Sequence, residues 1–236
     1  MLRARALFLL GALASGQAFA GAQMYEPLAA DAQAGLASSI ADPPTPHHGF
    51  SNSVDAVNWL SDMSIRLERR IPDFRVRLDF LRTVHYEATR AGLDPQLVLA
   101  VIQVESNFRK YAVSVAGARG YMQVMPFWTG LIGRRGDNLF SLRTNLRYGC
   151  VILKHYLAME KGNAERALAR YNGSLGKPEY PRLVFAALRG AWRYGAPVNV
   201  GPVPYPPGKS VAMVSCTACA ATRGSAAFRI GLPITM

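Results

Sequence analysis

Apolar residues recur at helical spacing along most of the middle of the chain. From residue 53 they predict a helix that is interrupted by Pro72, which opens a second helix closed by Gly92 as a C-terminal cap. The same spacing predicts further helices over residues 95–105, 146–162, 164–172 and 183–192. No run carries the signature of a β-hairpin. The pattern therefore predicts a mainly α class with at most a minor β element.

One of these helices places an acid on an apolar face. Asp94 suits the N-cap and Pro95 the first helical position, where no backbone donor is lost. Glu105 follows Val101 and Val98 by four and seven residues, so it shares their stripe and should point inward. Burial against aliphatic groups would raise its pKa and suit it to donate a proton near neutral pH. Taken alone, such an acid is more often capped or paired for structural reasons.

The stretch from residue 111 to residue 142 has irregular patterning and contains five glycines. We expect it to form loops and short turns of a cleft wall, where glycine permits close backbone approach to a ligand. The simpler interpretation is that these glycines only make turns.

Three motifs that occur in order along the chain favour a catalytic role for Glu105 over a structural one. They are the pair Glu105–Ser106, the block Gly120–Gln123 and the block Ala169–Asn172. With them the chain resembles the lytic transglycosylases of family 1, the soluble-lytic-transglycosylase (SLT) type, over roughly residues 54–195. Tyr121 replaces the usual leucine, and Arg170 separates Ala169 from the following tyrosine, but neither change removes a group that the chemistry needs.

The resemblance implies a lysozyme-like α+β fold, with residues 51–195 as a single goose-type-lysozyme-like catalytic domain containing a deep cleft. It implies cleavage of the MurNAc-GlcNAc β-1,4 bond of peptidoglycan, with Glu105 as acid and then base and a 1,6-anhydromuramyl product. Ordinary glycosidases use two carboxylates. Four acids follow Glu105 in the chain: Asp137, Glu160, Glu165 and Glu179. None lies in a functional-looking motif, so a second catalytic carboxylate is not apparent.

The same resemblance implies a set of substrate-binding residues around Glu105. Ser106 would orient the acid, and the Tyr171 hydroxyl would lie near it. For Met122, Met125 and Tyr171 the alternative interpretation is core packing. The full predicted set is Ser106, Ser114, Gly120, Tyr121, Met122, Gln123, Met125, Tyr171 and Asn172.

The net charge and the N-terminal leader together indicate which class of polymer the protein binds. The chain has 236 residues, a formal net charge of +12 and a pI near 10.1, which favours polyanions such as nucleic acid, anionic lipid or a wall polymer. Residues 1–20 predict a secretory signal peptide, with two arginines, a short apolar run and cleavage near Ala20, so we expect a periplasmic or secreted protein. Export favours peptidoglycan strands over nucleic acid. Gly21 stands where a lipoprotein would carry cysteine, so we expect no stable membrane insertion. We also expect a monomer.

The flanks of the domain have no motif of their own. Residues 21–50 are predicted to be an Ala/Pro-rich linker, mostly extended, in which His47 and His48 have no further ligands nearby. Residues 196–236 are predicted to be a Pro/Gly-rich basic tail without order. Its Cys216 and Cys219 lack the four ligands that zinc prefers, and we expect no metal or cofactor, while Cys150 should be a buried thiol.

Two alternatives remain open at this stage. One is a lysozyme-like muramidase that hydrolyses the same bond, which would need a second carboxylate to position water. The other is a non-catalytic peptidoglycan-binding protein, in which Glu105 is structural and the basic surface holds the glycan.

Overall fold

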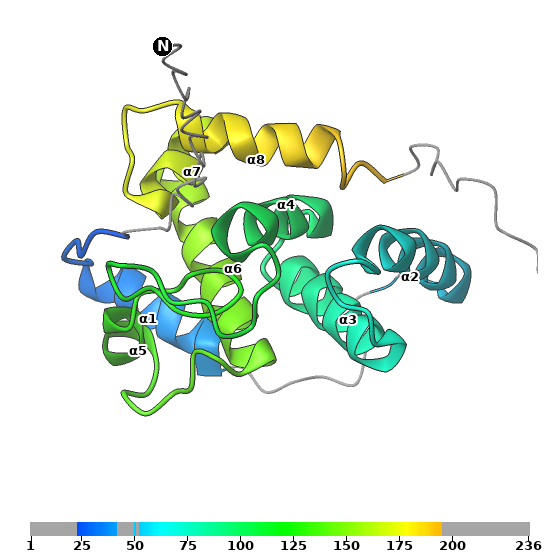
Figure 1. Ribbon diagram of the computed structural model, residues 1–236. Coiled ribbons are helices and arrows are strands. Elements are labelled where there is room, and N and C mark those ends of the chain that lie inside the picture. Colours follow the sequence, from blue (N-terminus) through cyan, green and yellow to red (C-terminus); the bar gives the residue numbers. More distant parts are fainter. Residues whose placement is uncertain (1–22, 42–49, 51, 195–236) are drawn as a thin grey trace, which may run out of the picture. The chain divides into compact units, whose positions relative to one another are not determined.

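The computed structural model describes residues 23–41, 50 and 52–194 (Figure 1). Within them lie eight helices: α1 (Ala30–Ala41), α2 (Ser53–Leu67), α3 (Phe74–Arg90), α4 (Pro95–Ser106), α5 (Phe127–Ile132), α6 (Leu142–Met159), α7 (Ala164–Asn172) and α8 (Glu179–Arg189). The pairing of β type in this part of the chain consists of two isolated antiparallel bridges, Val113 with Arg119 and Arg119 with Val124. The prediction of a mainly α fold is confirmed. The predicted leader, His47 and His48, and the tail with its two cysteines lie outside the described residues.

Side-chain caps explain where several helices begin. The Asp94 carboxylate accepts from the backbone N–H of Gln96, with Pro95 at the first position of α4 as expected. The helix α3 begins at Phe74, not at Pro72, because the Asp73 carboxylate accepts from the N–H of Val76. Within α8, Pro181 occupies the first turn, where its missing donor costs nothing.

The interpretation of residues 21–50 as a mostly extended linker is wrong for residues 30–41, which form α1. This helix packs on α5 and α6, and Ile40 belongs to the hydrophobic core. The Gln33 side chain also donates to the Leu131 carbonyl at the end of α5, at 2.8 Å. The alanine-rich sequence that suggested a linker is also a strong helix former once a neighbouring surface covers its apolar side.

A fully buried carboxylate, Glu87 of α3, anchors the end of α1. Its Oε2 accepts from Arg90 Nε at 3.0 Å and from Arg147 Nε at 3.3 Å. The same two arginines donate through Nη1 to the carbonyls of Ser39 and Ile40, at 2.8 and 3.1 Å. Cations at a helix C-terminus satisfy its last carbonyls and oppose its dipole. The acid thus orients two arginines that cap α1.

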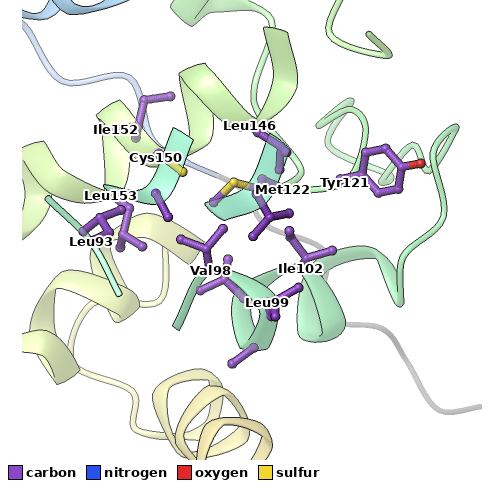
Figure 2. Close-up of a cluster of buried hydrophobic side chains, with 14 of the residues drawn as sticks. Leu93, Val98, Leu99, Ile102, Tyr121, Met122, Leu146, Cys150, Ile152 and Leu153 are labelled. Atoms are coloured by element: carbon purple, nitrogen blue, oxygen red, sulfur yellow. The ribbon is translucent and has the colours of Figure 1, made fainter. Parts of the chain in front are cut away.

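The helices α3, α4 and α6 enclose the centre of the core, and α8 lies along α4 (Figure 1). Figure 2 shows the Met122 side chain between Val98 and Ile102 of α4 and Leu146 and Cys150 of α6. Cys150 is a buried free thiol, as expected, and burial raises its pKa. Within the described residues, no helix combines the length and the apolar character that a membrane span requires.

Close packing under Met122 yields a first prediction. A Cβ added to Gly149 of α6 would lie 2.4 Å from Met122 Sδ and 2.8 Å from Met122 Cβ. Alanine is favoured over glycine by about 1 kcal/mol in a helix, whereas overpacking a core typically costs about 1–3 kcal/mol. We therefore expect Gly149→Ala to lower the free energy of unfolding in urea.

Gly35 of α1 provides the matched control, because no atom outside its own helix would meet its added Cβ within 4 Å. Gly35→Ala should leave stability unchanged or raise it. A Gly149→Ala variant as stable as the parent would show that Met122 does not pack as described.

A second prediction concerns Glu160, at the end of α6. Its carboxylate accepts from Arg166 and Arg170 of α7, and these hydrogen bonds lower its pKa below the ordinary value. A carboxyl group with a lowered pKa in the folded state contributes stability above its unfolded pKa of about 4.3 and loses that contribution as pH falls. The free energy of unfolding, measured from pH 7 down to pH 3, should therefore decrease more steeply in the parent than in Glu160→Gln. Parallel curves would contradict this role.

Candidate functional site

The site is centred on Glu105 in the last turn of α4. Its side chain is only 2 % exposed, so the expectation that it points inward is confirmed. The Tyr180 hydroxyl, from the first turn of α8, donates to Glu105 Oε1 at 2.7 Å. Burial, followed by the nearby Glu105 charge, raises the Tyr180 pKa well above its ordinary value, so the phenol stays protonated and remains a donor. The packing of α8 on α4 thus fixes the acid.

The hydroxyl that bonds to Glu105 in the structure belongs to Tyr180, which the sequence analysis did not single out. The hydroxyl of Tyr171, which the sequence placed near Glu105, donates instead to the Met122 carbonyl at 2.7 Å. Tyr171 is fully buried, and burial raises its pKa well above the ordinary value, with the Glu105 charge as a second cause. One available signal for Tyr180 was its spacing, since it shares a helical stripe with Val184 and Ala187, which are also buried.

The loop containing Gly120 and Met122 is held by Asn145 of α6, which sequence reasoning missed. The Asn145 side chain is completely buried, and its Oδ1 accepts from the Met122 N–H at 2.8 Å. Its Nδ2 donates to the carbonyls of Arg119 and Leu139, at 2.8 and 2.9 Å. A Cβ at Gly120, whose φ is +75°, would lie 2.5 Å from Asn145 Nδ2. Only glycine fits against this clamp.

Two predicted binding residues also shape the loop. Gln123, 1 % exposed and with a φ of +48°, donates through Nε2 to the carbonyls of Gly120 and Ala112, at 2.9 and 3.1 Å. Ser114 Oγ accepts from the Ala118 N–H at 3.0 Å. These contacts show loop-forming roles, and contact of either side chain with sugar stays a prediction.

The remaining predicted residues lie around this loop. Met122 packs in the core, as the alternative interpretation held. Ser106 Oγ donates to the Ile102 carbonyl of its own helix at 3.2 Å. The centroid of the Tyr121 ring lies 5.0 Å from that of the Phe80 ring. Figure 2 shows the Tyr121 ring directed away from Met122. Asn172, nearly buried, is the last residue of α7.

A residue of the expected linker completes the loop's supports. Gln23 is 3 % exposed, and its Oε1 accepts from the Met125 N–H at 3.2 Å. Met125 itself is partly buried at the end of the motif loop. The alanine-rich composition around Gln23 gave no signal for this contact.

Two of the other acids are committed to structural contacts. Asp137 Oδ2 accepts from the Tyr148 hydroxyl at 2.6 Å, and Glu160 binds two arginines of α7. Glu165 and Glu179 lie in the first turns of α7 and α8. The part of the chain that the structure describes holds no group of three side chains suited to bind a metal ion. Glu105 is therefore the candidate acid.

Comparison with known proteins agrees with this geometry. Residues 82–180 match the family model of the transglycosylase SLT domain. The chain is 36 % identical over 92 residues to a protein of Mannheimia succiniciproducens named membrane-bound lytic murein transglycosylase C, a match that covers 34 % of this chain and 26 % of that protein. Proteins of the same name match from Actinobacillus pleuropneumoniae, at 44 % over 59 residues (24 % and 16 % of the two chains), and from Yersinia pestis, at 33 % over 113 residues (41 % and 32 %).

The chain thus spans about a third or less of the curated relatives that it matches. The matched family segment nevertheless contains the whole constellation described above except the N-terminal contacts: Glu105, the loop through Gln123, Asn145, Tyr171 and Tyr180. Residues 82–180 of this protein are therefore similar to the transglycosylase SLT domain of lytic transglycosylases.

Proposed function

We propose that this protein is a peptidoglycan lytic transglycosylase that cleaves the MurNAc-GlcNAc β-1,4 bond and leaves a 1,6-anhydromuramyl end. The observation that carries the proposal is the buried Glu105 carboxyl, held at 2.7 Å by the Tyr180 hydroxyl beside the SLT motif loop. A carboxyl group withdrawn from water and oriented by a phenol is suited to give up a proton and take one back within the site.

The proposed reaction needs one carboxyl group in two successive roles. Protonated Glu105 gives its proton to the glycosidic oxygen as the bond to the muramyl C1 breaks. The N-acetyl group of the substrate stabilises the developing positive charge. The Glu105 carboxylate then removes the proton from the muramyl 6-hydroxyl, whose oxygen bonds to C1. Glu105 ends the cycle protonated, and no water is consumed.

The surroundings of Glu105 support this assignment over hydrolysis. A muramidase of the ordinary type needs a second carboxylate to activate water. Three of the other carboxylates, those of Glu87, Asp137 and Glu160, are instead bonded to arginine or tyrosine side chains. The product distinguishes the two reactions, because hydrolysis adds one water to the mass and the anhydro route adds none.

Substrate contacts and location complete the proposal. Ser114, Gly120, Tyr121, Gln123 and Asn172 would line the glycan path around the loop that Asn145 holds, with Met125 at its end. The net charge of +12 supports attraction to an anionic wall. The basic and apolar leader supports action in the envelope as a periplasmic or secreted monomer, after cleavage near Ala20.

Glu105→Gln tests the central assignment. The amide keeps the shape of the side chain and can still bond to Tyr180, but it has no transferable proton. General acid–base catalysis contributes about 10²- to 10⁴-fold, and one residue serves both roles here, so we expect a loss at or beyond the upper end. Mass spectrometry of muropeptides released from purified sacculi measures it. Release of anhydromuropeptides at near the parent rate would refute the assignment.

The two buried tyrosines are expected to differ in effect. Tyr180→Phe removes the hydroxyl that orients Glu105 and donates to the carboxylate formed as its proton leaves. A hydrogen bond to a charged group contributes about 1.5–3 kcal/mol, so kcat should fall about 10- to 100-fold. Tyr171→Phe leaves the buried Met122 carbonyl without this partner. It should lower the free energy of unfolding by about 1–3 kcal/mol with a smaller effect on kcat.

Kinetics and urea unfolding of both variants separate these roles. The assignment of Tyr180 would fail if the Tyr171 variant lost more kcat than the Tyr180 variant while remaining folded.

A further inference from the structure

A cavity of about 500 Å³ lies against α5, with Arg119 and Pro126 from the two ends of the motif loop in its lining. Two arginines, Arg119 and Arg135, and two aromatic rings, Tyr25 and Phe127, contribute to its lining. Tyr25 belongs to the N-terminal segment, outside the matched residues 82–180. The cavity is thus formed jointly by the SLT domain and a segment that precedes it.

Specific contacts hold the N-terminal wall of this cavity in place. Gln23 Oε1 accepts from the Met125 N–H, and Gln33 Nε2 donates to the Leu131 carbonyl. Between these two contacts the Tyr25 ring meets the Phe127 ring edge-on, with centroids 5.7 Å apart. The wall is therefore fixed at three points.

The charged lining favours an anion. Neither the Arg119 nor the Arg135 side chain has an ion pair or hydrogen bond within the described residues. Asp137 also lines the cavity, but its Oδ2 accepts from the Tyr148 hydroxyl at 2.6 Å and from the Arg134 N–H at 3.3 Å. A guanidinium group presents paired donors that match the two oxygens of a carboxylate.

The cavity shares its loop with the candidate catalytic site. The backbone of Arg119 pairs with that of Val124 in both directions, at 2.9 and 3.0 Å, and its carbonyl accepts from Asn145. The residues between them form the Gly120–Gln123 motif. A ligand group in the cavity would therefore contact the same loop that borders the proposed glycan path.

We propose that this cavity binds the acidic peptide stem that peptidoglycan carries on its muramyl residues. Arg119 and Arg135 would hold stem carboxylates, and Tyr25 with Phe127 would contact the apolar groups of the stem. The inference rests on the proposed function, since it assigns a further part of the same substrate to a second site.

The test compares two substrates, glycan strands with intact stems and the same strands after enzymatic removal of the stems. Arg119→Gln combined with Arg135→Gln should lower kcat/KM about tenfold on strands with stems, because charge-assisted bonds of this kind contribute at least that factor. The rate on stem-free strands should stay at the parent value.

A matched control removes the same charge elsewhere. Arg69 and Arg75 are exposed near the junction of α2 and α3 and have no ion pair among the described residues. Arg69→Gln combined with Arg75→Gln should leave both rates unchanged. Equal losses in the two double variants, or equal losses on the two substrates, would overturn the proposal in favour of general charge attraction.

A binding measurement separates this inference from the proposed reaction. Calorimetric titration of the full-length protein with free stem peptide should give binding that the Arg119 and Arg135 variant weakens about tenfold and that Tyr25→Ala also weakens. If the parent cleaves neither strand but binds the peptide in this way, the reaction is refuted and the cavity's role stands. If the parent cleaves strands but shows no peptide binding, the inference is refuted and the reaction stands.

Discussion

The structure around the site depends on the buried amide of Asn145. A loop without regular structure can be buried only if its backbone donors and acceptors find partners, because an unpaired buried polar group costs about 1–3 kcal/mol. One side chain bonds to Met122, Arg119 and Leu139, and Tyr171 supplies the hydroxyl for the Met122 carbonyl. The core side of the loop is thereby fixed, and the segment from Gly120 to Gln123 is positioned relative to Glu105.

Two buried carboxylates use their surroundings in opposite ways. Glu87 is completely buried but ion-paired with Arg90 and Arg147, which in turn cap α1. These contacts make it a structural acid. Glu105 is 2 % exposed, and its Oε1 accepts from the Tyr180 hydroxyl. Similar burial thus accompanies a role in assembly for Glu87, whereas for Glu105 the bond to a phenol fits the proton exchange that we propose.

The N-terminal segment links assembly to the candidate site. The arginines oriented by Glu87 hold the end of α1, and Gln23 and Gln33 hold its approach to the motif loop and to α5. The matched family segment begins only at residue 82. The segment before it therefore adds contacts to the motif loop and to α5 from outside the matched residues.

Local sequence is enough to specify α2, α3, α4, α6, α7 and α8, because their apolar spacing and caps such as those at Asn52, Asp94 and Asn163 act within a few residues. It also determined the inward direction of Glu105, which follows from the stripe that it shares with Val98 and Val101. Three features needed the tertiary structure: the choice of Tyr180 over Tyr171, the clamp by Asn145, and the packing of α1. Each depends on contacts between segments far apart in the chain, from 23 residues for Asn145 and Met122 to 107 for Arg147 and Ile40 of α1. No local pattern encodes which hydroxyl meets which carboxylate, because helix packing decides it.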